Sequence, residues 1–273
     1  MGPRLISCFG KSGRSSRNGK NDVAATSDEA ILEEQRRGDG VVLVELFSSQ
    51  GCKTSPEAEL LMSRLGRGDF NLEKPIIVLG FHVDYWDYLG WKDPFGSSLY
   101  TVRQKAYVES LQLDTIFTPQ VVVQGRAHCV GNEEEILLST IDSAPRFPSP
   151  NFQANFQRPS SETLQVTLSG QVRMKIDQQG ANIMVALYEN GLVTNCPKGE
   201  NTGRVLSNDF VVRKLEKLCS IKDTSPKKNI SGTVNFPLWE TFTSSKCGIV
   251  VFVQQNSSHH IFGSQKFDVP DNL

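Results

Sequence analysis

The chain has 273 residues, of which 38% are hydrophobic and 22% charged, a composition typical of a globular protein with one large or two ordinary domains. Its formal net charge of −1 provides no basic surplus for phosphate binding, so we do not expect nucleic acid as a partner. No apolar run is long enough to span a bilayer, so we expect no transmembrane segment.

Residues 1–37 are expected to form a disordered basic tail and lead-in. The first part of this tail is rich in Lys and Arg but lacks the apolar stretch of a secretory signal, so we expect a cytoplasmic protein. Targeting to an organelle remains open. Cys8 adds a further alternative, since palmitoylation beside basic residues would give weak peripheral membrane association.

The segment 41–47 is expected to be a buried central strand because its apolar and β-branched residues are almost continuous. Cys52 follows this strand. Pro56 suits the first turn of a helix that apolar spacing extends to about residue 67. Cys52 therefore lies at a strand-to-helix junction, where unpaired amides and the helix dipole lower the pKa of a thiol.

The following segments alternate between strands and helices. Apolar runs predict strands at 76–83, 120–124 and 127–130, and helical spacing predicts helices at 97–111 and 133–142. The strand, helix, strand order implies a right-handed parallel crossover, which brings the ends of both strands to one edge of a sheet.

This order resembles the thioredoxin superfamily. The turn from Gln50 to Pro56 resembles the active-site turn of that family, and Thr118–Pro119 resembles its cis-proline loop. A closer resemblance is to an uncharacterised family in which a thioredoxin-like domain precedes a β-rich domain. It is carried by the motifs ELFSSQGC, FHVDYWDYLGWKDPF, TPQVVVQGR, ALYENGLVTN and KGENTGR.

The resemblance implies a fold and a chemistry. Residues 38–146 would form a thioredoxin-like α/β domain with Cys52 as nucleophile, while Thr118 and Pro119 would present backbone to a substrate strand. Members of the family commonly carry a second cysteine three residues after the first, where this chain has Ser55. A mixed disulfide on Cys52 would then have to be released by another thiol, and Ser55 would tune the sulfur.

The function expected from this Cys-Lys-Thr-Ser turn is monothiol thiol–disulfide exchange with protein thiols. Glutathione would serve as co-substrate, and neither a resident cofactor nor a metal is expected. The alternative is a non-catalytic binding or scaffold protein that keeps the fold without turnover.

The loop 84–95 is rich in aromatic residues and leaves its strand on the edge that carries Cys52. Trp86 and Trp91 could line a substrate groove there, or they could pack internally. His82 is expected to be a hydrogen-bonded core histidine, with a metal ligand or an acid–base group as the alternatives. Cys129 is expected to be a buried core thiol.

The second half is expected to be all β. A proline-rich stretch predicts a linker at 147–160, followed by a β-sandwich-like domain at 161–273. Residues 209–219 fit a helix or a strand equally well. Residues of the KGENTGR motif, Asn201 and Arg204 among them, are interpreted as a loop that docks the two halves rather than as a site.

Overall fold

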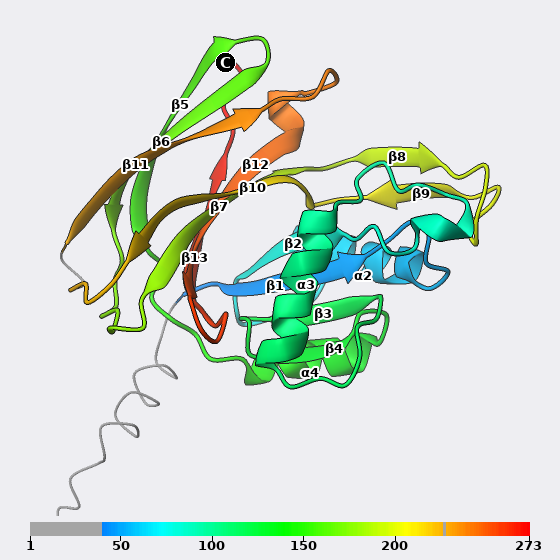
Figure 1. Ribbon diagram of the computed structural model, residues 1–273, viewed down its shortest axis with the longest axis horizontal. Helices are drawn as coiled ribbons and strands as arrows, with labels where there is room; N and C mark the ends of the chain where they lie inside the picture. Colours follow the sequence, from blue (N-terminus) through cyan, green and yellow to red (C-terminus); the bar gives the residue numbers. More distant parts are fainter. Residues whose placement is uncertain (1–39, 226–227) are drawn as a thin grey trace, which may run out of the picture.

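The computed structural model describes residues 40–225 and 228–273 (Figure 1). The expected tail at 1–37, with Cys8, lies outside these residues. None of the helices in the described ranges has the length and hydrophobicity that a membrane span requires.

The first half alternates strands and helices in the expected order, with bounds close to those expected. Its elements are β1 (Val42–Ser48), α2 (Ser55–Arg67), β2 (Ile76–His82), α3 (Ser98–Ser110), β3 (Gln120–Val123), β4 (Ala127–Val130) and α4 (Glu134–Ser143). A short 3-10 helix, η1 (Asp87–Leu89), lies in the aromatic loop. Strands β1 and β2 are parallel, as the crossover rule requires.

The second half consists of strands and one short 3-10 helix, η2 (Ser244–Lys246). The strands are β5 (Asn151–Ser160), β6 (Thr163–Gln171), β7 (Ala181–Glu189), β8 (Leu192–Asn195), β9 (Val205–Asn208), β10 (Val211–Ile221), β11 (Asn229–Pro237), β12 (Cys247–Gln255) and β13 (Ile261–Asp268). The ambiguous segment 209–219 is thus a strand.

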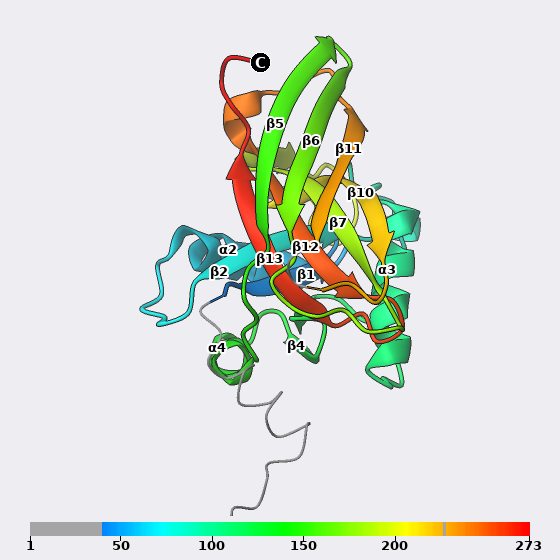
Figure 2. The ribbon, with the colours of Figure 1, turned by 90° about the vertical axis from the view of Figure 1, so that its left-hand side faces the viewer.

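The expected fold class, a thioredoxin-like α/β domain followed by a separate all-β sandwich, is wrong. Strands from both halves form one eight-stranded mixed sheet in the order β13-β12-β7-β10-β2-β1-β3-β4. Figure 2 shows β13, β12 and β7 of this sheet behind β5, β6 and β11. The physical reason lies at β2, whose edge away from β1 carries backbone groups that need partners. The Gly80 amide donates to the Phe210 carbonyl at 2.8 Å, and Val211 pairs with Gly80, so β10 covers this edge.

The central strand β1 separates two packed layers because alternate side chains point to opposite faces. Val42, Val44 and Leu46 face α2 and α4, whereas Leu43 and Phe47 face α3. The layer on the α3 side also contains buried residues of β7, β12 and β13. The hydrophobic core on this face therefore belongs to both halves of the chain.

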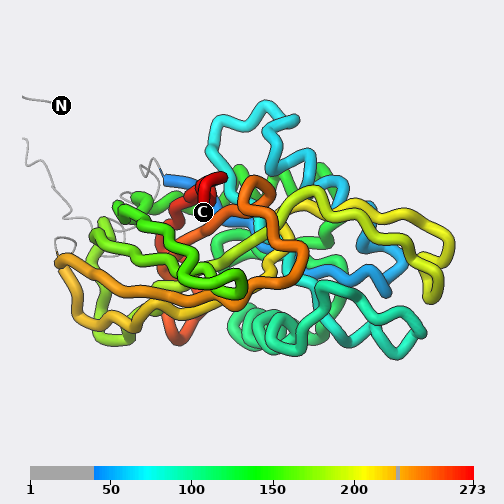
Figure 3. Tube along the Cα trace, turned by 90° about the horizontal axis from the view of Figure 1, so that it is seen from above, coloured from blue at the N-terminus to red at the C-terminus, as the bar shows by residue number. Residues whose placement is uncertain are grey.

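A three-stranded sheet, β11-β6-β5, packs on the strands of the second half. Strand β5 occupies residues 151–160, where a linker was expected. The hairpin β8–β9 was not expected, and it packs beside α2. Figure 3 shows this hairpin at the end of the molecule opposite the three-stranded sheet.

Candidate functional site

Cys52 lies in the turn between β1 and α2, with 4% of its surface exposed. Its amide donates to the Ser49 carbonyl at 3.0 Å, which closes the turn before the helix begins. The sulfur is 3.5 Å from Thr54 Oγ1 and 3.6 Å from the Thr118 carbonyl oxygen. The expected residues Cys52, Ser55, Thr118 and Pro119 thus meet at one place.

Hydroxyl groups surround the Cys52 sulfur. Ser55 Oγ accepts from the Ser49 amide at 3.2 Å, which leaves the hydroxyl hydrogen of Ser55 for the sulfur. Burial raises the pKa of Cys52, but hydrogen bonds from Ser55, Thr118 and Thr54 outweigh it, so the net pKa is lowered. The arrangement therefore favours the thiolate, which is the nucleophilic form of cysteine.

Thr118 connects this turn to the aromatic loop. The Thr118–Pro119 peptide bond is cis, and the indole of Trp86 donates to Thr118 Oγ1 at 2.7 Å. A side chain at Gly51 would come within 2.9 Å of Trp86 Cβ, so glycine permits this close packing. The indole N–H of Trp86 is therefore engaged inside the protein, and its ring is half-buried against the Cys52 turn.

Trp91 occupies a second internal position. Its indole donates to Gln50 Oε1 at 3.2 Å, and Gln50 Nε2 donates to Asn208 Oδ1 on β9 at 2.9 Å. The loop, the Cys52 turn and the β8–β9 hairpin are thus connected through one amide side chain. These contacts favour the internal-packing interpretation of Trp86 and Trp91 over an open substrate groove.

The loop between β8 and β9 docks on the Cys52 turn, as interpreted from the KGENTGR motif. Asn201 is 1% exposed, and its amide nitrogen donates to the carbonyls of Gln50 at 2.8 Å and Cys52 at 3.0 Å. Arg204 in turn donates to Asn201 Oδ1 at 2.8 Å. The second half therefore holds the backbone on both sides of Gly51.

A buried cluster of ionisable groups lies behind the turn. His82 is fully buried, with Nδ1 at 2.7 Å from Asp93 Oδ2 and Nε2 at 3.2 Å from Glu59 Oε1. Burial lowers the pKa of His82, yet the two carboxylates outweigh it and raise that pKa to about 10. Asp93 Oδ2 also accepts from the Gln50 amide at 2.7 Å. His82 is therefore the hydrogen-bonded core histidine that was expected.

The partners of His82 were not identified from the sequence. A signal for Glu59 was present, because Ser55, Glu59 and Ser63 recur every four residues and form a polar stripe on the buried face of α2. Asp93 carried no such signal, since it lies in an irregular loop. Tyr85 was also missed as a polar neighbour of Cys52; burial raises the pKa of its phenol to about 12.

The other described cysteines differ from Cys52. Burial raises the pKa of Cys129 to about 11 and that of Cys247 to about 12, and it also raises the pKa of Cys196 and Cys219. All five described cysteines are unpaired. Cys129 is 6% exposed in the core beside α4, as expected.

Several solved structures resemble the fold of this chain, including two that match most of its length. One is a protein from Agrobacterium tumefaciens, with 23% identity, a TM-score of 0.59, and coverage of 86% of this chain and 96% of that one. The other is HBP35 of Porphyromonas gingivalis, with 11% identity, a TM-score of 0.60, and coverage of 85% and 76%. At these identities the likeness establishes the fold alone. No curated protein sequence matches the chain.

The resemblance to a thioredoxin-superfamily member, with a separate thioredoxin-like domain, is wrong. The family that matches is described as a protein of unknown function, DUF1223, and its match covers residues 43–254. That match extends through both halves of the chain, in agreement with the shared eight-stranded sheet. Because the match covers most of its length, the chain belongs to the DUF1223 family.

Proposed function

We propose that the protein carries out monothiol thiol–disulfide exchange through Cys52, with glutathione as the second thiol. The observation that supports this proposal best is the lowered pKa of Cys52, in contrast to the raised pKa values of the other four described cysteines. The thiolate is the form of cysteine that attacks a disulfide, so a lowered pKa favours this reaction.

The exchange has two steps. The Cys52 thiolate attacks the glutathionyl sulfur of a mixed disulfide, forming a Cys52–glutathione disulfide and releasing the substrate thiolate. A glutathione thiolate then attacks the glutathione sulfur of this adduct, which yields glutathione disulfide and restores the Cys52 thiolate. Ser55, which contacts the Cys52 sulfur, has no thiol that could resolve the adduct, so the adduct would persist until a second thiol arrives.

The test is adduct formation with glutathione disulfide, followed by mass spectrometry of the intact protein. Cys8 lies outside the described residues, so every protein in this test carries Cys8→Ser. We expect one glutathione on the protein with no further change and none when Cys52→Ser is added. The Cys129→Ser variant is the matched control and should behave as wild type. The Cys196→Ser variant tests whether Cys196 releases glutathione from Cys52, because Cys196 Sγ lies 4.0 Å from Gln50 Oε1, beside the turn. An adduct as abundant in this variant as in its parent would show that Cys196 plays no such part.

The second candidate is a binding protein without turnover. The low exposure of Cys52, 4%, favours it, because a protein disulfide has little access to the sulfur. If wild-type protein forms no adduct while Cys52 still reacts with a small alkylating agent, the exchange proposal fails and the binding role is preferred.

A further inference from the structure

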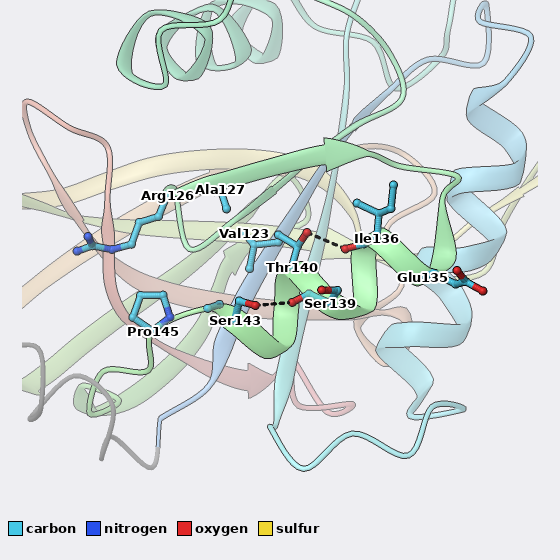
Figure 4. Close-up of a pocket in the computed structure, with 10 residues that line it drawn as sticks. Val123, Arg126, Ala127, Glu135, Ile136, Ser139, Thr140, Ser143 and Pro145 are labelled. Atoms are coloured by element: carbon cyan, nitrogen blue, oxygen red, sulfur yellow. Dashed lines mark hydrogen bonds between the residues drawn. The ribbon is translucent and has the colours of Figure 1, made fainter.

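A cavity of about 450 Å³ lies between the β3–β4 turn and α4, and its lining shares no residue with the Cys52 site (Figure 4). Ala127, Ile136 and Pro145 form part of its apolar lining. The charged groups are Arg126 and Glu135, which Figure 4 shows at opposite ends of the lining. A ligand that fits this cavity therefore needs an apolar body and one polar end.

Arg126 is the group that requires explanation. Its Nε atom is shielded from solvent, and no acceptor in residues 40–225 and 228–273 lies within hydrogen-bond distance of it. Within the same ranges Arg126 forms no ion pair. The guanidinium carbon lies 5.1 Å from the ring centroid of Phe147 and 5.5 Å from that of Phe262. These rings supply cation–π contacts and no hydrogen-bond acceptor.

An unpaired Nε–H in this position is costly. Arginine stays protonated in proteins, so the shielded Nε–H loses its hydration and gains no acceptor in return. The neighbouring imidazole shows the local positive potential, since burial and the charge of Arg126 lower the pKa of His260 to about 4. An anion beside the guanidinium would supply a hydrogen-bond acceptor and would reduce the local positive potential.

We propose that this cavity binds a small organic monocarboxylate. The carboxylate would pair with the two terminal N–H₂ groups of Arg126, which are not shielded as Nε is and whose fork matches two carboxylate oxygens. The apolar body would lie on Ala127, Ile136 and Pro145. Glu135 at the far end disfavours a second negative charge on the ligand.

A phosphate is a poorer fit because few other donors are available. Thr140 donates to the Ile136 carbonyl at 2.7 Å, and Ser143 donates to the Ser139 carbonyl at 2.9 Å (Figure 4). Both hydroxyl hydrogens are thereby used within α4, which leaves the Ser139 hydroxyl as the one other side-chain donor among the described residues of the cavity lining. The single guanidinium therefore suits a singly charged carboxylate better than a doubly charged phosphate.

The test is calorimetric titration of the full chain with octanoate, and with octan-1-ol as the neutral probe of matched length. Arg126→Gln should weaken octanoate binding at least about tenfold, the loss expected for a charged hydrogen-bonded contact. It should leave octanol binding unchanged. Arg158→Gln is the matched control, because Arg158 also lies over an aromatic ring, that of Phe242 at 5.5 Å.

A second variant addresses the cavity itself. Ser139 is exposed and lines the cavity, so Ser139→Trp should block it without disturbing the core and should abolish binding of both probes. Three results would overturn the proposal: no octanoate binding to the wild type, equal affinity of octanoate and octanol, or octanoate affinity unaffected by Arg126→Gln. Urea unfolding of each variant establishes that it is folded.

Discussion

The hydroxyl groups around Cys52 are the residue-scale basis of its lowered pKa. Replacing Ser55 by alanine removes one hydrogen-bond donor from the thiolate, while burial, which opposes ionisation, stays. We therefore expect the pH midpoint of Cys52 alkylation to rise, and the rate below the midpoint to fall at least about fivefold. Iodoacetamide labelling with peptide mass spectrometry measures both quantities.

The matched control for this variant is Ser139→Ala, which removes an exposed hydroxyl away from the site. It should leave the alkylation profile of Cys52 unchanged. An unchanged midpoint in Ser55→Ala would show that Ser55 does not stabilise the thiolate.

His82 makes a second residue-scale prediction, which concerns stability and pH. Its pKa is raised from 6.5 to about 10 in the folded protein, so the stabilisation is fully present below pH 6.5 and is lost as pH rises towards 10. In this window the folded state holds one more proton, and the free energy of unfolding should fall by up to about 1.4 kcal/mol per pH unit. Urea unfolding between pH 6 and 9.5 measures this slope.

The His82→Gln variant should lose this slope and be less stable at pH 6, because Glu59 and Asp93 lose their cationic partner. His128→Gln is the control, since His128 is exposed on β4. Equal slopes in wild type and His82→Gln would contradict a protonated His82 in the folded protein.

At the scale of elements, the sequence predicted the first half well because β1 and β2 are nearly continuous apolar runs and α2 has a clear helical spacing of apolar residues. Residues 151–160 show why the prediction failed for other segments. The prolines of the region indicated a linker, yet Phe152, Ala154 and Phe156 alternate inward along β5. This period of two was the correct signal. The hairpin β8–β9 is short and partly exposed, so it has little apolar pattern to detect.

The loop of this hairpin gives a prediction for one element docking on another. Asn201→Ala leaves two buried carbonyls, those of Gln50 and Cys52, without their donor. We expect the free energy of unfolding to fall by about 1–3 kcal/mol, as for loss of a buried hydrogen-bond partner. Urea denaturation measures the change.

Asn195→Ala is the control in the same hairpin, because Asn195 is exposed on β8. Its effect should stay within about 0.5 kcal/mol. If Asn201→Ala has an equally small effect, the loop does not hold the Cys52 turn.

At the scale of the whole molecule, the error in the fold came from strand pairing. Local patterns identify β2 as an apolar strand, but they leave the segment of β10 open between helix and strand and contain no information on which strand covers the free edge of β2. The polar contacts that join the two halves could not be predicted from the sequence either. Arg103 on α3 donates to Glu45 on β1 at 2.8 Å and to Gln254 on β12 at 3.0 Å. Such partners can be recognised only when the fold is known.

The shared sheet and core predict that the two halves unfold together. Phe47 and Tyr107 pack in the same buried cluster as Tyr188 and Phe252, so loss of either half exposes the apolar surface of the other. Pulsed alkylation in urea can follow each half separately, because Cys129 and Cys247 are both 6% exposed and lie in different halves. We expect their protection to be lost at one urea concentration. Cys129→Ser and Cys247→Ser assign the two signals, and clearly separated midpoints would instead mean that the sheet joins two independently stable domains.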